Sequence, residues 1–328
     1  MDGVTDALMR EFLSERSPYS YCVSEFIRVN SEAPSAKTFA KDIPELKTAC
    51  RTAAGTTVQI QILGGNPDAL AEAAARIVQL GGYGVDINFG CPAPTVNRHD
   101  GGATLLKYPH RIETIVSSVR SAVPIEQPVS AKLRLGWDDA QAIHKNAEAA
   151  ARGGASWITI HGRTKMQGYT PPAYWGPIGE VRRSLSIPVV ANGEIWSLDD
   201  LKRCEEVTGC RHFMLGRGAL AEPGLATLCA AYLHTPIERV RMPLFGSSTE
   251  RWSELLGSLV NLSATRGESD ARTLSRLKQW LNYACKKGGA HWFSEVKRAT
   301  TTGDLLSTLH LLSLGRDIPL CATGIERS

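Results

Sequence analysis

This 328-residue sequence has no long apolar run and no closely paired cysteines, and most of it has no excess of either charge. No run of about 18 apolar residues occurs, and no basic stretch leads into an apolar one at the start, which argues against a membrane span and a secretory signal. The eight cysteines form no C-x-x-C pair, so neither a zinc site nor a disulfide framework is predicted. We therefore expect a soluble, cytoplasmic protein without a metal centre.

The composition is that of a globular protein with a slight basic excess at one end. Hydrophobic residues make up 43% and charged residues 21% of the chain, which is long enough for one large α/β domain and a smaller second one. Residues 1–239 carry 25 basic and 25 acidic side chains, whereas residues 240–328 carry 12 and 8. The net charge of +4 therefore lies in the last quarter, where it fits either a polyanionic partner or an unspecific surface excess.

Between residues 20 and 220, short β-rich runs alternate with stretches of helical periodicity. The predicted strands are 21–28, 57–63, 83–88, 129–134, 157–161, 189–191 and 212–215, and the predicted helices between them include 67–80, 109–122, 139–152 and 198–207. This alternation predicts a parallel sheet. Because polar residues recur at the carboxyl ends of so many strands, an α/β fold of the TIM (β/α)8 barrel type is favoured.

The two ends of the chain depart from the barrel pattern. The sequence starts at Met1 with a turn and a helix N-cap, although an eighth strand belongs there, so the first strand is expected to be truncated. Residues 236–246 read as a linker, and 249–314 read as amphipathic helices without a strand. We predict a barrel domain over 1–238 and a small all-α helical bundle over 239–328.

The predicted strands place a ring of polar residues at the carboxyl edge of the barrel, where βα loops build active sites. The ring consists of Gln61, Asn88, Cys91, Lys132, Arg134, His161, Asn192, Glu194, Gly216 and Arg217. Each residue alone could be structural. Burying all of them without a ligand would cost about 1–3 kcal/mol apiece, which favours a ligand site.

Two segments of the ring suggest what binds there. The Gly-Arg-Gly run at 216–218 follows the last strand and opens a helix, which is where barrels hold phosphate groups. No G-x-G-x-x-G follows a strand, so FMN is predicted rather than a dinucleotide in a Rossmann site. Cys91 lies on a loop after a strand and could be a general acid, a nucleophile or an inert thiol.

Six motifs in this order resemble those of the tRNA-dihydrouridine synthases. They are DINFGCP at 86–92, GGA at 101–103, KLRLGW at 132–137, HGRT at 161–164, ANGE at 191–194 and GRG at 216–218. Within that family, FIRV at 26–29, TKMQGY at 164–169 and RLKQWL at 276–281 resemble the bacterial group that modifies uridine 16.

The resemblance implies an FMN enzyme that takes hydride from NADPH and reduces a D-loop uridine of tRNA to 5,6-dihydrouridine. Cys91 would be the general acid that protonates the base. The implied FMN contacts are Met1, Asp2, Gln61, Lys132, His161, Asn192, Gly193, Glu194, Gly216 and Arg217. The implied tRNA contacts are Arg28, Asn88, Arg134, Tyr169, Arg276, Lys278 and Tyr283. We expect the enzyme to act as a monomer.

A helix through 272–286 would present a basic face. At 100° per residue, five basic, amide or aromatic side chains fall within one arc of about 80° on the helix surface, and four apolar side chains fall on the other side. The members of the arc are Arg272, Arg276, Gln279, Tyr283 and Lys286. Without the resemblance, an ordinary solvated helix face is the simpler interpretation; with it, contact with RNA is favoured.

Two other functions stay open at this point. A flavin ene-reductase or pyrimidine dehydrogenase that acts on a free small molecule would share the barrel, the FMN site and the acid, but would not need the basic helices. A non-catalytic RNA-binding protein is conceivable because a missing first strand would leave an open edge and an incomplete barrel.

Overall fold

A computed structural model describes residues 3–233, 246–287 and 290–315. The chain divides into two compact units: residues 1–219 with 224–242 form unit 1, and residues 220–223 with 243–328 form unit 2. No helix among the described residues is long and apolar enough to cross a membrane. The predicted linker at 236–246 lies outside the described residues except for Gly246.

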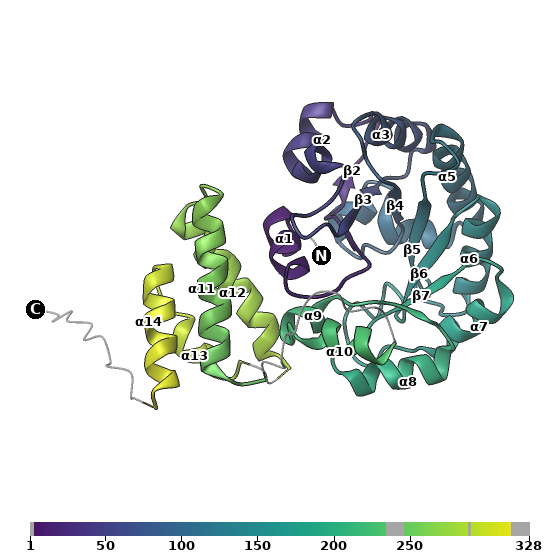
Figure 1. The fold of residues 1–328 in the computed structure, drawn as a ribbon. Helices are drawn as coiled ribbons and strands as arrows, with labels where there is room; N and C mark the ends of the chain where they lie inside the picture. Colours follow the sequence, from purple (N-terminus) through teal and green to yellow (C-terminus); the bar gives the residue numbers. More distant parts are fainter. Residues whose placement is uncertain (1–2, 234–245, 288–289, 316–328) are drawn as a thin grey trace, which may run out of the picture. The chain divides into compact units, whose positions relative to one another are not determined.

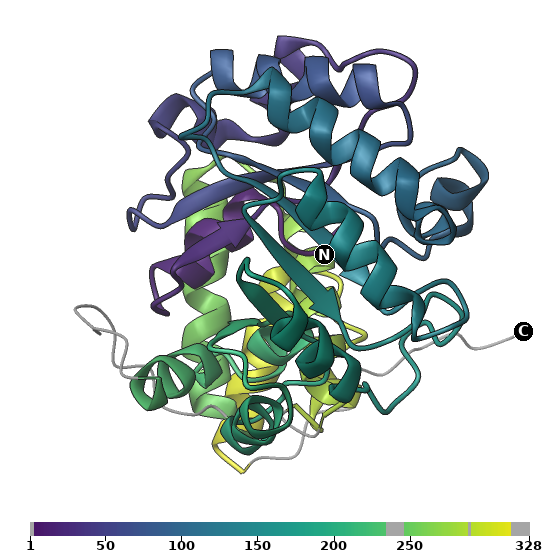
Figure 2. The ribbon, with the colours of Figure 1, turned by 90° about the vertical axis from the view of Figure 1, so that its right-hand side faces the viewer.

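Unit 1 is built on a parallel sheet with the strand order of a barrel (Figures 1 and 2). Its strands are β1 (Tyr21–Val23), β2 (Ile27–Arg28), β3 (Thr57–Leu63), β4 (Val85–Asn88), β5 (Val129–Arg134), β6 (Trp157–His161), β7 (Val189–Asn192) and β8 (His212–Met214). β1 and β2 both pair with β3, and each later strand pairs with the next. Among the described residues, the series of paired strands ends at β1 on one side and at β8 on the other, so the sheet is barrel-like with an open side.

The strand predicted over 21–28 is interrupted in the middle, for a reason that lies in its side chains. The backbone N–H of Gln61 donates to Ser24 Oγ at 3.0 Å, so a hydroxyl takes the place of a backbone carbonyl in the ladder. The next residue, Glu25, turns its carboxylate to the N–H groups of Val4 and Thr5 at 2.8 and 3.0 Å. Because Ser24 N still donates to the Gln59 carbonyl at 3.0 Å, the chain leaves the ladder after Ser24 and returns to β3 at Ile27.

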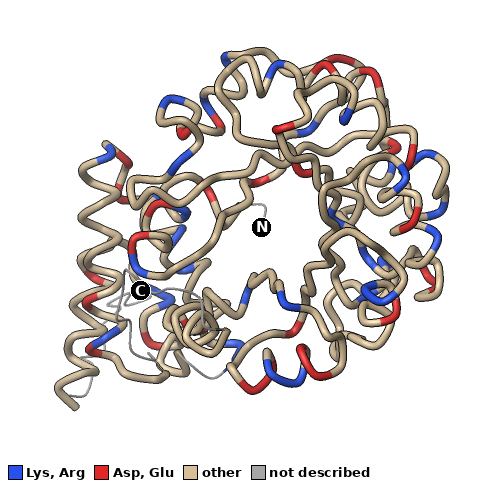
Figure 3. The backbone as a smooth tube through the Cα atoms, turned by 45° about the vertical axis from the view of Figure 1, so that its right-hand side comes forward, with Lys and Arg blue, Asp and Glu red and all other residues tan. Residues whose placement is uncertain are grey.

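Helices cover the outer face of the sheet (Figure 1). Those of unit 1 are α1 (Ala7–Ser14), α2 (Ala36–Asp42), α3 (Pro67–Gln79), α4 (Pro94–Arg98), α5 (Pro109–Ala122), α6 (Ala142–Arg152), α7 (Gly176–Ser184), α8 (Leu198–Thr208) and α10 (Leu225–Tyr232), with 3-10 turns at Pro44–Thr48 and Gly102–Lys107. The short helix α9 (Arg217–Ala221) begins in unit 1, and its last two residues belong to unit 2. The hydrophobic core lies between strands and helices, where Ile60 and Ile87 join Leu70 and Ile115 in one buried cluster. Figure 3 shows both charge signs interspersed along these outer helices.

The inner face of the sheet is polar, unlike the branched apolar layers that usually fill such barrels. Gln59, Asp86, Ser130 and Thr159, from four neighbouring strands, are at most 2% exposed. They alternate with apolar residues that face the helices, which is the two-residue period of a strand. Hydrogen bonds join Gln59, Ser130 and Asp86 beneath the carboxyl edge, whereas Thr159 Oγ1 has no partner among the described residues.

Unit 2 is helical, as predicted for 249–314. It contains α11 (Thr249–Thr265), α12 (Asp270–Cys285), α13 (Phe293–Val296) and α14 (Thr302–Ser313). The side chains of Ser248, Ser269 and Thr301 cap the amino ends of α11, α12 and α14. Its core contains an aromatic cluster in which the ring of Trp252 meets those of Trp280 and Trp292 edge-on, at centroid distances of 5.6 and 6.1 Å.

Candidate active site

The carboxyl edge of the sheet brings the predicted polar ring together. The pairing register aligns Gln61 with Asp86, Asn88 with Lys132, and His161 with both Arg134 and Asn192. Residues from β3 to β7 that are up to 131 positions apart in sequence therefore share one rim. The strand register, rather than any loop, fixes their positions.

Lys132 is the cation at the centre of this rim. Its Nζ donates to Asn192 Oδ1 at 3.1 Å, and Asn192 Nδ2 in turn donates to the carbonyl of Met214 at 2.8 Å. Burial, and next the nearby Arg134, lowers the pKa of Lys132 to about 8, against which the Asp86 carboxylate acts. Lys132 is therefore still mainly protonated at neutral pH, with an ammonium group that is costly to leave without an anionic or acceptor partner.

Asp86 lies beneath the rim and was not predicted. Its carboxylate accepts from Gln61 Nε2 at 2.6 Å and from Ser130 Oγ. Burial raises its pKa to about 6, an effect opposed by the hydrogen bonds from Ser130 and Gln61 and by the charge of Lys132. At neutral pH this buried group is thus mainly a carboxylate, which only accepts hydrogen bonds.

His161 lies among cations. Burial, together with the charges of Lys132, Arg134, Arg163 and Arg217, lowers its pKa well below the usual value. The imidazole is therefore neutral at physiological pH. Its Nδ1 is buried and has no hydrogen-bond partner among the described residues, which marks it as an atom with capacity for a ligand.

Gly193 and Glu194, which directly follow β7, both have a positive φ, although only glycine adopts such a backbone readily. Gly193 has a φ of 113°, and a Cβ there would lie 3.2 Å from His161 Cδ2. Glu194 also has a positive φ, 58°, which is uncommon for a residue with a side chain. Its carboxylate pairs with Arg163, fully buried, at 2.8 Å and lies 3.4 Å from Arg217, so ion pairs hold the unfavourable backbone in place.

The loop that carries Cys91 is held by its backbone. Gly90 N donates to Asn88 Oδ1 at 2.9 Å, and Arg134 Nε donates to the Gly90 carbonyl at 2.8 Å. The carbonyl of Cys91 accepts from Ala103 N at 3.1 Å. The half-buried thiol lies close enough to Arg134 for the two to interact electrostatically. The sulfur therefore stands at the rim on a fixed loop.

Tyr169 is an exposed aromatic residue at this edge, with 56% of its surface accessible. The guanidinium carbons of Arg134 and Arg217 lie 5.2 and 4.9 Å from its ring centroid, and His161 meets it edge-on at 6.3 Å. Cation–π contacts of this kind steady a ring without covering it. The rim thus offers a supported, solvent-facing aromatic surface.

Most of the predicted site residues gather in unit 1, but not all. Met1 and Asp2 lie outside the described residues. Arg28 is exposed at the carboxyl end of β2. Arg276, Lys278 and Tyr283 belong to α12 in unit 2, so no geometry links them to the rim.

The basic face predicted for 272–286 is interrupted. Arg276 is 8% exposed and pairs with Glu268 at 2.6 Å, instead of standing in solvent. Its helical angle puts it at the border of the predicted arc, next to the buried Thr273 and Trp280. Lys278, a predicted tRNA contact outside this arc, donates from Nζ to the carbonyl of Ala299 at 2.6 Å. Lys286 and Gln279 remain exposed.

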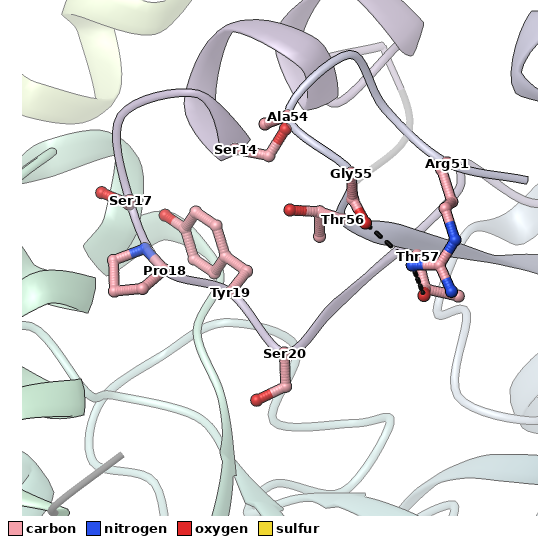
Figure 4. Close-up of a pocket in the computed structure, with 10 residues that line it drawn as sticks. All are labelled: Ser14, Ser17, Pro18, Tyr19, Ser20, Arg51, Ala54, Gly55, Thr56 and Thr57. Atoms are coloured by element: carbon pink, nitrogen blue, oxygen red, sulfur yellow. Dashed lines mark hydrogen bonds between the residues drawn. The ribbon is translucent and has the colours of Figure 1, made fainter. Parts of the chain in front are cut away.

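A cavity of about 220 Å³ lies at the opposite edge of the sheet (Figure 4). Its lining includes Ser20 and Thr57, which stand at the amino ends of β1 and β3. Arg51 at its border donates to the Gly55 carbonyl and to Thr57 Oγ1 rather than pointing into the space. None of the predicted rim residues lines this cavity, so we do not assign the active site to it.

Comparison with known proteins gives consistent matches along the chain. A family model described as dihydrouridine synthase (Dus) matches residues 1–312. The tRNA-dihydrouridine(16) synthase of Shewanella oneidensis is 43% identical over 94% of this chain and 95% of its own. That of Yersinia pestis is 42% identical over 100% and 98%. A solved 2-naphthoyl-CoA reductase complex, 12% identical, covers 69% of this chain and 46% of its own with a TM-score of 0.54, a likeness of fold alone.

Proposed function

We propose that this chain, which belongs to the dihydrouridine synthase family, reduces uridine 16 of tRNA to 5,6-dihydrouridine. The family is flavin-dependent, so the chain is an oxidoreductase. The observation that carries the proposal is that the rim residues of unit 1 stand in a chain that is 42–43% identical, over nearly its full length, to relatives named for this reaction.

The rim residues fit a flavin, and we propose FMN with NADPH as reductant. Lys132 Nζ has three donors, of which one goes to Asn192 among the described contacts. His161 Nδ1 is buried without a described partner. These atoms match the carbonyl and nitrogen acceptors of an isoalloxazine ring. Gln61, Asn192, Gly193 and Glu194 would complete its surroundings, and Gly216 with Arg217 would hold the phosphate.

When bound, FMN supplies the hydride for the uracil ring. We infer that Cys91 supplies the matching proton, because hydrogen bonds hold its loop and its thiol lies near Arg134 of the same rim. A positioned acid of this kind accelerates a reaction about 10²- to 10⁴-fold. Lys132 contributes positive charge, which stabilises negative charge that develops beside it. Reduction of the double bond is then complete, with one hydride and one proton added.

The tRNA would reach this rim through groups on its outer border. Tyr169 offers an exposed ring on which an unstacked base can lie, and Arg28 offers an exposed cation for a phosphate. Arg134 lies beneath Tyr169, and Asn88 stands beside the Cys91 loop. From unit 2 we retain Arg276, Lys278 and Tyr283 as proposed contacts. We expect the protein to work as a monomer in the cytoplasm.

The two alternatives left open by the sequence are not favoured. A reductase of free small molecules is disfavoured because relatives that match over nearly full length are named for a tRNA substrate. A non-catalytic RNA-binding protein is disfavoured because the chain keeps a polar rim with uncommitted buried donors, which RNA binding alone does not require.

The experiment is a comparison of two substrates with the full chain. Protein supplied with FMN and NADPH is incubated with unmodified tRNA or with free uridine, and dihydrouridine is measured by mass spectrometry. We expect product from tRNA and none from free uridine. Equal turnover of both would refute tRNA as the substrate, and no product from either would refute the activity.

A further inference from the structure

The hydrogen bonds of Asp86 form a directed chain that ends at the Cys91 loop. Gly90 N donates to Asn88 Oδ1 at 2.9 Å, Asn88 Nδ2 donates to Gln61 Oε1 at 2.8 Å, and Gln61 Nε2 donates to Asp86 Oδ2 at 2.6 Å. Every bond in this series points toward the carboxylate. The series joins β3, through Gln61, to β4 and the loop that follows it, and its only backbone member is the Gly90 N–H.

The two ends of this series decide the orientation of the amides between them. A backbone N–H only donates and a carboxylate only accepts, so Gln61 and Asn88 have one arrangement that satisfies every member. If either amide turned over, two oxygens or two NH2 groups would face each other in a buried place. Since hydrogen bonds in series also polarise one another, the arrangement favours a single state.

The second hydrogen bond of the carboxylate leads away from the site. Asp86 Oδ1 accepts from Ser130 Oγ, which in turn accepts from Gln59 Nε2 at 3.1 Å. This branch runs toward the amino ends of the strands and touches neither Gln61 nor the Cys91 loop. The Ser130 branch therefore serves as a control. It binds the same carboxylate and is similarly buried, but it has no connection to the reacting groups.

We propose that Asp86 is a positioning residue, which fixes the amides of Gln61 and Asn88 and through them the Gly90-Cys91 backbone. Its effect on the reaction rests on the proposed function, whereas its effect on the loop does not. A loop displaced by about 1 Å can cost about 100-fold in rate. Burial of this carboxylate costs free energy even with its two hydrogen bonds and the nearby charge of Lys132, so we assign it to placement of the acid and not to stability.

Three variants separate this role from a merely structural one. Asp86→Ala removes the acceptor for Gln61 Nε2. Asp86→Asn keeps an acceptor oxygen for Gln61 and can donate its Nδ2 to Ser130 Oγ, so the amide order survives without the charge. Ser130→Ala removes the other hydrogen bond of the same carboxylate and leaves the series to Gly90 intact.

The first measurement is hydrogen exchange of the Gly90 amide in the full chain. Loss of about one net hydrogen bond should speed this exchange about five- to ten-fold in Asp86→Ala, with Asp86→Asn and Ser130→Ala within about two-fold of the wild type. A structural role would instead raise exchange along the whole of β3 and β4. Unchanged exchange at Gly90 in Asp86→Ala, or equal loss in Ser130→Ala, would overturn the proposal.

The second measurement separates the two halves of the reaction by stopped-flow absorbance. In Asp86→Ala, oxidation of the reduced enzyme by tRNA should slow about 10- to 100-fold more than reduction by NADPH, and Asp86→Asn should restore most of the rate. Equal slowing of both halves would overturn the proposal. If the wild type shows no oxidation by tRNA, the proposed function fails, while the exchange result at Gly90 still tests the role of Asp86.

Discussion

Replacing Cys91 by alanine should slow the tRNA reaction by orders of magnitude while leaving the site intact. Four hydrogen bonds hold the loop without using sulfur: Gly90 N to Asn88, Arg134 Nε to the Gly90 carbonyl, and Ala103 N and Asn97 Nδ2 to the Cys91 carbonyl. Removing one half-buried sulfur should therefore cost the fold less than about 1 kcal/mol. The loss that remains is chemical.

The size of that loss follows from the role of the thiol. A general acid contributes about 10²- to 10⁴-fold, which corresponds to about 3–5 kcal/mol of activation free energy. Single-turnover oxidation of the reduced enzyme by tRNA should slow by this factor. Reduction of the enzyme by NADPH should stay within about two-fold of the wild type, because entry of hydride does not use the acid.

A matched variant is Cys285→Ala in α12, which removes another half-buried thiol at a distance in sequence from the rim. It should leave both half-reactions unchanged. Near-normal tRNA turnover by Cys91→Ala would refute Cys91 as the acid. Slowing of both half-reactions together would show that the substitution disturbs the site rather than the proton transfer.

Three further predictions concern stability, pH and RNA affinity. Arg276→Met should lower the free energy of unfolding by about 2–3 kcal/mol in urea titrations, because it leaves the largely buried carboxylate of Glu268 without its 2.6 Å partner; an unchanged midpoint would contradict the pairing. The pKa of Lys132 is lowered to about 8 from 10.5, so its contribution to stability is present above pH 10.5 and is lost as the pH falls through about 8. In flavin-free protein, the stability of the wild type relative to Lys132→Met should therefore increase as the pH rises through this window. A stability difference that does not depend on pH would count against the lowered pKa. Arg28→Glu should weaken tRNA binding and reduce its salt dependence by about one ion without affecting NADPH oxidation. The control Arg183→Glu, at the carboxyl end of the outer helix α7, should change neither the tRNA affinity nor its salt dependence. Equal effects of the two substitutions would indicate an unspecific response to charge.

The strands that bear the rim were predictable because their patterns are local. The runs at 57–63, 129–134 and 157–161 were predicted to the residue, since β-branched residues and sharp flanking turns mark both ends. The run at 21–28 was predicted as one strand, whereas Ser24 and Glu25 divide it. That division depends on Gln61 and on the backbone at Val4 and Thr5, which a local pattern does not include.

Asp86 could not be found from sequence for a similar reason. An acidic residue within a short apolar strand is expected to be energetically unfavourable when buried. Its partners Gln61 and Ser130 lie 25 and 44 positions away in the sequence. The signal that existed was alternation: polar residues at every second position of neighbouring strands indicate a polar inner face. The burial of Arg276 was missed because a helical wheel treats a residue at the border of an arc as solvent-exposed, whereas Glu268 and the neighbouring core decide its environment.

The position of the modified uridine tests the central claim most directly. Dihydrouridine should be mapped in tRNA from a strain that lacks this gene, and again after the gene is returned with wild-type or Cys91→Ala sequence. We expect loss of dihydrouridine at position 16, the position in the names of the matching relatives, and recovery with the wild-type gene alone. Loss at another D-loop position with position 16 unchanged would contradict the assignment of the substrate, and recovery with Cys91→Ala would contradict the role of the thiol.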